Sequence, residues 1–254
     1  VGRSETFSDV VEREFTPSAK KTSCDRIQLL GNSHSLMLMP MISLIGEKLN
    51  IDVSLTEKSD GEWPLIPSGD RRNLNKLDYL TSDLKDGDLL IISSRNFLLY
   101  ERPYIMASGL EYHEPAKFAK HSKWGLDIWL DELDEVIATA ARKGFRVVLV
   151  LPFPEFDEPI MNSELSQEEW FRPQKNRHTP VVSEEFLADR FNQRFYEELR
   201  NRAQAFDNFF TFDPVPLFRN ENGNFKVTVN GVAAFNDTNH LSRDGAMLLL
   251  KPFY

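Results

Sequence analysis

The sequence predicts an α/β fold, a three-layer α/β/α sandwich with a central parallel sheet of the flavodoxin-like kind. Two observations support this prediction. Short apolar runs alternate along the chain with longer stretches of helical periodicity, and several of the runs are apolar on both faces, as in strands covered by helices on both sides. The chain has 254 residues, of which 41% are hydrophobic, which is enough for one sizeable core. We therefore expect one folded domain.

The first half of the chain contains three candidate strands and one candidate helix. Residues 26–31 (RIQLLG) form the first apolar run, and residues 51–55 and 88–94 form the next two. Between the first two strands, residues 36–49 are helical by length, and we expect Pro40 in the first turn, where a missing N–H is tolerated. Strands joined by such helices indicate a parallel sheet.

The second half begins with a long segment, residues 95–123, that is loop-like and rich in His, Pro and Tyr. Apolar residues then recur at helical spacing over residues 124–144, and Gly144 suits a left-handed cap at the end of this helix. The remaining predicted elements are a strand over 145–152, a helix over 184–206, a strand over 208–214, a hairpin over 223–235 and a final helix over 242–251.

The beginning of the chain differs from the rest. Residues 1–24 are polar and weakly periodic, which favours a linker or connecting segment, and the folded domain is expected over 25–254. The chain starts at Val1 without a charged and then apolar leader pattern, so we expect no signal peptide in it. No run of about 18 apolar residues occurs, so no transmembrane segment is expected. The single cysteine, Cys24, leaves the compartment open.

The charge balance argues against one broad class of partner. Lys and Arg number 30 while Asp and Glu number 39, which gives a net charge of -9. Binding to nucleic acid depends on neutralising phosphates with basic side chains, so no nucleic-acid partner is expected. His113 lies in the acidic stretch EYHE, but no zinc-ligand pattern supports it elsewhere in the sequence. We therefore expect neither a metal site nor a cofactor.

The segment 29–35, LLGNSHS, ends the first predicted strand and leads into the first helix. Functional groups of an open parallel sheet gather at the carboxyl ends of the strands, which is where Ser33 falls. Backbone N–H groups and the positive end of a helix favour negative charge at such a position. The segment by itself also fits a helix cap, since serine is a preferred cap residue. Both roles are open at this point.

The far end of the chain bears on that choice. Residues 235–246, FNDTNHLSRDGA, place Asp237 and His240 three residues apart at the entrance to the last helix. A hydroxyl nucleophile needs a base, and the base needs a carboxylate that fixes its tautomer. Ser33, His240 and Asp237 therefore form a candidate catalytic triad. The alternative is a helix-capping loop in which Asp237 or Ser242 is the cap and His240 is merely exposed.

Together these two segments resemble the first and last sequence blocks of the SGNH, or GDSL-like, esterase and acyltransferase superfamily. The resemblance is greatest to SGNH domains fused to membrane-bound acyltransferase-3 proteins, whose first block usually reads Gly-Asp-Ser-His and whose last reads Asp-x-x-His-Leu-Ser-x-x-Gly-Ala. The resemblance implies the SGNH hydrolase fold, with Ser33 as nucleophile, His240 as base and Asp237 as its carboxylate partner. The matching positions are Gly31, Ser33, His34, Asp237, His240, Leu241, Ser242, Gly245 and Ala246.

The sequence departs from this family pattern in two places. Asn32 replaces the usual Asp, which removes a charge beside the nucleophile. The middle blocks that supply Gly and Asn oxyanion donors in the family are not recognisable in this sequence. By position, the candidates are Gly61 after the second strand and Asn96 after the third, and Gly61 fits a simple turn equally well. An α/β-hydrolase is disfavoured because its Gly-x-Ser-x-Gly elbow needs glycine where this chain has Ser35.

The resemblance also implies a function. It implies serine-dependent transfer of an O-acetyl group to a sugar hydroxyl of a bacterial surface polysaccharide or lipopolysaccharide, through an acyl-enzyme on Ser33. It further implies a periplasmic domain tethered to a membrane acyltransferase that delivers the acetyl group. Two alternatives stay open: a carbohydrate esterase of SGNH type, and a non-catalytic glycan-binding domain of the same fold. Residues that bind the substrate are not identified.

Overall fold

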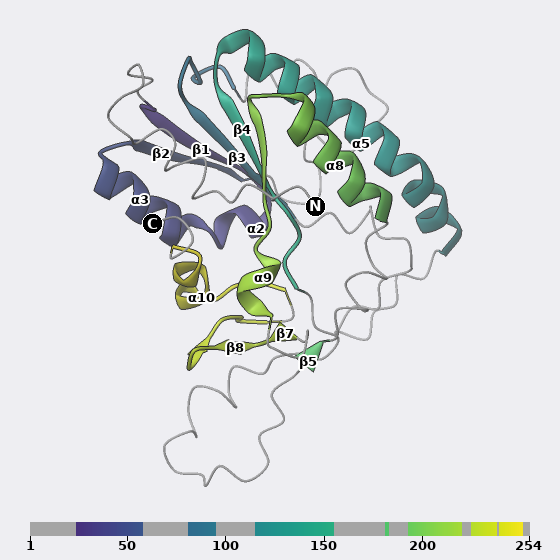
Figure 1. The fold of residues 1–254 in the computed structure, drawn as a ribbon. Coiled ribbons are helices and arrows are strands. Elements are labelled where there is room, and N and C mark those ends of the chain that lie inside the picture. Colours follow the sequence, from purple (N-terminus) through teal and green to yellow (C-terminus); the bar gives the residue numbers. More distant parts are fainter. Residues whose placement is uncertain are drawn as a thin grey trace, which may run out of the picture.

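The computed structural model describes residues 24–57, 81–94, 115–154, 181–182, 193–219, 225–237 and 239–250. Within these residues, five parallel strands form a sheet in the order β2-β1-β3-β4-β6. A flavodoxin-like sheet has this order, because the chain first moves to one edge and then crosses back to build the other. The predicted fold class, an α/β sandwich with a central parallel sheet, is confirmed (Figure 1).

Long elements form the layers, and short ones gather at the carboxyl end of the sheet. The sheet strands are β1 (Arg26–Gly31), β2 (Asp52–Glu57), β3 (Leu89–Ser93), β4 (Arg146–Val150) and β6 (Phe209–Phe212). The longer helices are α3 (Met39–Leu49), α5 (Pro115–Lys143) and α8 (Gln193–Ala205). The short elements are α2 (Ser33–Leu36), β5 (Val181–Val182), α9 (Val215–Phe218), β7 (Phe225–Lys226), β8 (Thr228–Val229), β9 (Val232–Ala233) and α10 (Arg243–Leu248).

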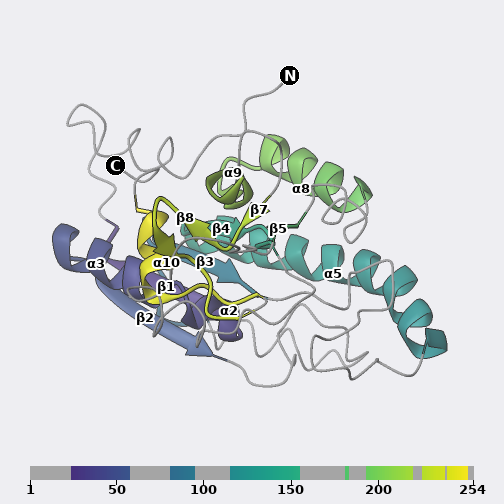
Figure 2. The ribbon, with the colours of Figure 1, turned by 90° about the horizontal axis from the view of Figure 1, so that it is seen from below.

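The two faces of the sheet bury different side chains, because successive residues of a strand point to opposite sides. In β3, Ile91 packs in a cluster with residues of α3 and α10. Its neighbours Leu90 and Ile92 pack in another cluster, with residues of α5 and α8. Figures 1 and 2 show the same division, with α5 and α8 on one side of the sheet and α3 and α10 on the other. The sheet is therefore the middle of three layers.

Most of the predicted elements are found. The five sheet strands lie where the apolar runs predict them, with slightly shifted ends. Pro40 lies in the first turn of α3. Gly144 follows the last residue of α5 with a φ of 83°, the left-handed conformation that glycine adopts without a steric penalty. The predicted hairpin is present as β8 and β9, and α10 lies within the predicted final helix. Of the helix predicted over 184–206, residues 184–192 lie outside the described part.

Three expectations need correction. The loop predicted over 95–123 is wrong in its last part, because α5 begins at Pro115; proline suits the first position of a helix, and the following Ala and Lys residues favour helix. The single helix predicted over 36–49 is divided by a turn at 37–38 into α2 and α3. Helix α9 follows β6 directly, in a segment for which the sequence predicts no helix.

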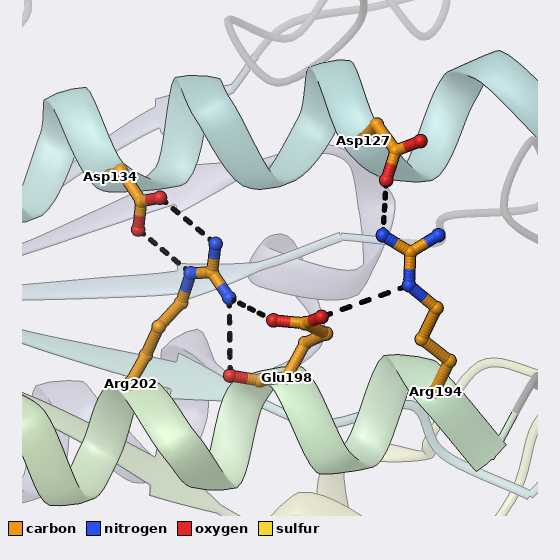
Figure 3. Close-up of polar contacts among 5 residues, drawn as sticks. All are labelled: Asp127, Asp134, Arg194, Glu198 and Arg202. Atoms are coloured by element: carbon orange, nitrogen blue, oxygen red, sulfur yellow. Dashed lines mark hydrogen bonds and ion pairs between the residues drawn. The ribbon is translucent and has the colours of Figure 1, made fainter.

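Charged side chains connect α8 to α5 (Figure 3). Arg202 on α8 donates to both carboxylate oxygens of Asp134 on α5, at 2.7 and 2.9 Å, and to Glu198 one turn away at 2.8 Å. Glu198 also lies 3.7 Å from Arg194, which pairs with Asp127 on α5. The side chain of Arg202 is only 15% exposed, against 49% for Arg194. Arg202 is therefore the residue of this group that we expect to contribute most to stability.

Candidate active site

Ser33 is the first residue of α2 and lies just beyond the carboxyl end of β1. The N-cap of this short helix is Asn32, whose side-chain oxygen accepts a hydrogen bond from the backbone N–H of His34 at 3.0 Å. The capping role that the sequence leaves open for Ser33 therefore belongs to its neighbour. An amide oxygen at position 32 performs the capping that a carboxylate would also perform.

Gly31 lets the ends of β1 and β3 approach closely next to Ser33. A Cβ atom on residue 31 would lie 1.8 Å from the backbone oxygen of Ser93 and 3.2 Å from the Cβ atom of Ser35. No side chain fits in that space, so the position requires glycine. The Ser93 hydroxyl also donates to the backbone carbonyl of His34 at 3.2 Å. The end of β3 is thereby connected to α2.

The second segment of the site is the turn between β9 and α10, and hydrogen bonds fix both of its ends. The backbone N–H of Asn236 donates to the carbonyl of His240 at 2.8 Å, and that of Ser242 donates to the carbonyl of Ala234 at 2.9 Å. The hydroxyl of Ser242 caps α10 by accepting from the backbone N–H of Gly245 at 2.8 Å. The alternative of a capping loop is thus correct for Ser242, but His240 has side-chain partners of its own.

The side chains of Ser33, His240 and Asp237 lie in one line of hydrogen bonds. His240 Nε2 lies 2.8 Å from Ser33 Oγ, and His240 Nδ1 lies 2.7 Å from Asp237 Oδ2. A carboxylate can only accept, so the imidazole proton belongs on Nδ1, and Nε2 accepts from the serine hydroxyl. The fold therefore brings together all three residues of the predicted triad, from segments 207 positions apart.

Asp237 is fixed by its own loop. Its Oδ1 accepts from the backbone N–H groups of Asn239 at 2.9 Å and His240 at 2.8 Å, while Oδ2 faces the imidazole. Burial raises the pKa of the Asp237 carboxyl, but the hydrogen bonds from the His240 side chain and from these two N–H groups outweigh burial and lower the pKa to about 2. The carboxylate is therefore charged at neutral pH and can stabilise an imidazolium when His240 takes up a proton.

Two buried polar side chains lie next to this line of residues. His34 is 2% exposed and Asn239 is 4% exposed, and His34 Nε2 lies 3.2 Å from Asn239 Oδ1. The sequence analysis does not predict this contact. His34 appears there only as a position that matches the family motif, and Asn239 does not appear there. A signal was present, since each of these polar residues adjoins a member of the triad in the sequence.

The proposed oxyanion donors Gly61 and Asn96 lie outside the described residues, and both stay predictions. Within the described residues, no group of three or more His, Cys, Asp and Glu side chains is placed to hold a metal ion. No helix in the same part of the chain has the length and apolar character needed to cross a membrane.

The geometry around His240 is suited to one kind of chemistry. A serine hydroxyl that donates to an imidazole can lose its proton as its oxygen attacks an electrophilic carbon. An ionised carboxylate on the opposite ring nitrogen holds the imidazole in the required tautomer and stabilises its charged form. The arrangement can therefore serve nucleophilic catalysis by Ser33.

Comparison with known proteins gives one family match. The family described as "SGNH domain (fused to AT3 domains)" matches residues 6–254 of the chain. No curated protein matches the chain. Among solved structures, the chain is similar to the periplasmic domain of a lipopolysaccharide acetyltransferase from Salmonella ser. Paratyphi A, at 14% identity and a TM-score of 0.48, covering 91% of this chain and 83% of that chain. It is also similar to a GDSL-like lipase from Bacteroides thetaiotaomicron, at 14% identity and a TM-score of 0.44, covering 96% of each chain.

Proposed function

Since the chain belongs to the family of SGNH domains fused to AT3 domains, as its two motifs predict, we propose that it is a serine acyl-transfer enzyme with Ser33 as the nucleophile. The observation that carries the proposal is the line of hydrogen bonds from Ser33 Oγ through His240 to Asp237, at 2.8 and 2.7 Å. Membership in the family supports acyl transfer or ester hydrolysis in general. The roles of individual residues are our proposal.

In the proposed first step, Ser33 Oγ attacks the carbonyl carbon of an acyl donor while its proton passes to His240 Nε2. The tetrahedral intermediate collapses, the bond to the leaving oxygen breaks, and His240 returns the proton to that oxygen. An ester of Ser33 remains. In the second step His240 takes a proton from an acceptor hydroxyl, whose oxygen attacks the ester carbonyl. The bond between the acyl carbon and Ser33 Oγ then breaks, the acyl group leaves on the acceptor oxygen, and His240 returns the proton to Ser33 Oγ.

The negative oxygen of each tetrahedral intermediate needs hydrogen-bond donors. We propose the backbone N–H of Ser33 as one of them, together with Gly61 and Asn96 from the segments that follow β2 and β3. Losing one oxyanion donor costs about 3 kcal/mol in barrier in well-studied serine enzymes. Substitution of Asn96 is therefore expected to lower the rate much more than the affinity.

We propose a sugar hydroxyl of a bacterial surface polysaccharide or lipopolysaccharide as the acceptor, and an acetyl group as the acyl group. Fusion to AT3 domains in this family supports a membrane partner that supplies the acetyl group and a location on the extracytoplasmic, periplasmic side. In this proposal residues 1–24 connect the domain, residues 25–254, to that partner. A carbohydrate esterase is the second candidate function, because water attacks the acyl-enzyme in place of the sugar if the site does not exclude water.

Labelling with a fluorophosphonate tests the nucleophile. We expect one equivalent of label on Ser33, identified by peptide mapping, and loss of labelling in Ser33→Ala and in His240→Ala. Ser82→Ala is the matched control, because Ser82 is an exposed serine away from the site and its loss leaves labelling intact. Folded protein in which Ser33 does not react would contradict the enzyme and favour a non-catalytic glycan-binding domain.

A chromogenic acetyl ester separates transferase from esterase. Release of the chromophore is measured with and without an added polysaccharide, and the acetyl group is followed to free acetate or to the sugar. We expect the polysaccharide to divert acetyl groups from water to sugar hydroxyls. If added polysaccharide leaves the yield of free acetate unchanged, the esterase becomes the preferred function.

A further inference from the structure

The side chains of His34 and Asn239 are buried and polar, and the proposed reaction steps do not use them. Both are almost fully enclosed, with 2% and 4% of their surface exposed, and their side chains meet at 3.2 Å. Buried polar groups are costly unless they are hydrogen-bonded. A contact of this kind between two segments so far apart in the sequence makes their relative position specific, in a way that apolar packing alone does not.

The contact joins the two segments that carry the proposed reacting groups. His34 directly follows Ser33, and Asn239 directly precedes His240. The turn between β9 and α10 that carries Asp237 and His240 is called here the 237–240 turn. The bond between His34 and Asn239 is a second connection between α2 and this turn, in addition to the one from His240 to Ser33. It is also made by residues that take no part in proton transfer, so it can persist while the Ser33 proton moves.

The ring of His34 also supports that of His240. The two rings meet edge to face, with centroids 5.3 Å apart and planes at 77°. On another side, His34 meets Phe153, which follows β4, at 6.1 Å and 78°. Phe153 is 1% exposed and belongs to the core cluster on the α3 side of the sheet. His34 therefore packs between the core residue Phe153 and the imidazole of His240, and so helps to fix the position of that imidazole.

We propose that His34 is a positioning residue: its Nε2–H donates to Asn239 Oδ1 and holds the 237–240 turn where His240 can reach Ser33 and Asp237 together. The inference rests on the proposed function, since it concerns the same site. Without this donor the turn loses one of its attachments to α2. A displacement of about 1 Å in such a site costs about 100-fold in rate.

Two substitutions of His34 separate positioning from packing. His34→Phe keeps a ring against Phe153 and His240 but removes the donor, whereas His34→Gln places an N–H group near the original Nε2 position. Gln28→Leu is the matched control, because Gln28 is also buried, at 5%, and bonds Thr56 on β2 rather than the 237–240 turn. Circular dichroism establishes that each variant is folded.

The first readout is turnover of a chromogenic acetyl ester. For His34→Phe we expect kcat to fall about 10- to 100-fold with KM changed less than about threefold, because acyl-group binding does not involve this contact. His34→Gln recovers most of kcat, and Gln28→Leu keeps the wild-type kcat. Wild-type kcat in folded His34→Phe overturns the proposal, as does a failure of His34→Gln to restore any activity.

The second readout does not depend on turnover. The proton between His240 Nδ1 and Asp237 Oδ2 is expected to give a far-downfield NMR signal that is absent in Asp237→Asn. We expect His34→Phe to broaden or remove this signal and His34→Gln to keep it; an unaltered signal in His34→Phe overturns the proposal. If the wild type shows no Ser33-dependent turnover, the proposed function fails, and this signal still decides whether His34 positions the turn.

Asn239→Leu examines the same contact from the other side and replaces His34→Phe if that variant does not fold. It removes the acceptor and leaves the backbone N–H of Asn239 on Asp237. The same fall in kcat and the same loss of the NMR signal are expected. Normal kcat with a normal signal in folded Asn239→Leu overturns the proposal.

Discussion

The two outer layers of the molecule are built differently. The layer of α5 and α8 consists of two long helices, whose apolar residues fill one face of the sheet and whose charged residues pair with one another. The opposite layer contains α3 with the short α2 and α10, and its polar contacts meet at the carboxyl end of the sheet. In the first layer polar groups connect helix to helix; in the second they connect Ser33 to His240.

This difference predicts how substitutions divide. Changes in the α5–α8 layer should alter stability and leave turnover by the folded protein unchanged. Changes at the start of α2 or in the 237–240 turn should alter turnover more than stability.

Ser33→Ala should have the largest effect. The substitution removes the proposed nucleophile, so we expect turnover of an acetyl ester to fall about 10⁴-fold or more, as in other enzymes that lose such a serine. Ser33 is only half-buried, so the melting temperature should stay close to that of the wild type. Steady-state kinetics and thermal unfolding measure both. Turnover above about a tenth of wild type contradicts the proposed nucleophile.

Asp237→Asn should come next. An amide can offer its N–H to the imidazole and stabilise the wrong tautomer, so we expect kcat to fall about 10²- to 10⁴-fold with little change in KM. Asn236→Ala is the control, because this exposed neighbour keeps its backbone bond to His240 and loses only a side-chain bond to the Leu241 carbonyl. If Asp237→Asn and Asn236→Ala have equal effects on kcat, the carboxylate has no special role.

Leu133→Ala tests the opposite layer. Leu133 lies on α5, is fully buried, and packs in the cluster with β3 and β4. Removing most of its side chain leaves a cavity, so we expect the free energy of unfolding to fall by about 3 kcal/mol, while kcat per folded molecule is unchanged. Phe206→Ala is the control, since 40% of Phe206 is exposed and its loss should cost much less. A large fall in kcat for Leu133→Ala would break the division between the layers.

The stability that Asp237 contributes should depend on pH. Its pKa is about 2 in the folded protein, below the ordinary value of 3.8. The ionised form is thus favoured by folding, so the contribution is present above about pH 4 and is lost as the pH falls toward 2. Half of this side chain is exposed, which limits the effect. Urea unfolding of the wild type and Asp237→Asn should therefore differ less at pH 2.5 than at pH 5; a difference that grows on acidification has the wrong sign.

Arg202→Ala should have the smallest effect. The variant loses two bonds to Asp134 and two to Glu198, one to its carboxylate and one to its backbone carbonyl, and we expect the free energy of unfolding to fall by about 1 kcal/mol without a change in kcat. Arg194→Ala should cost less, because Arg194 is more exposed. The loss for Arg202→Ala should shrink in high salt, which screens such pairs. If both variants lose the same free energy of unfolding, the burial of Arg202 adds nothing to its contribution to stability.

Much of the fold is predictable from the sequence because its strands are covered on both faces. Such strands are continuous apolar runs, which stand out between polar segments, and the parallel order follows from the helices between them. The start of α5 is less visible, since His, Lys and Trp in 115–124 give a weak apolar stripe. The division between α2 and α3 is hidden for the opposite reason, because the apolar pattern continues through the turn at 37–38.

The candidate site is predictable in part. Ser33, Asp237 and His240 stand in two short motifs whose residue types suit one chemistry, and the fold brings them together. Only their positions after the second and third strands indicate Gly61 and Asn96, and position does not determine which way a backbone N–H points. The contact of His34 with Asn239 depends on how α2 is oriented against the 237–240 turn. Tertiary packing decides that orientation, and no local pattern encodes it.

The separation of Ser33 and His240 along the chain has a consequence for the order of events in folding. Ser33 and His240 are 207 positions apart in the chain, and their contact depends on β1, the rest of the sheet and the segment before α10 all lying in their final positions. Contacts between such distant residues carry a high entropic cost and form late. If Ser33 and His240 act as proposed, a partly folded chain in which they have not yet met holds no activated nucleophile that could react with nearby esters. Reactivity of Ser33 in a labelling experiment should therefore report that the two segments of the site have come together.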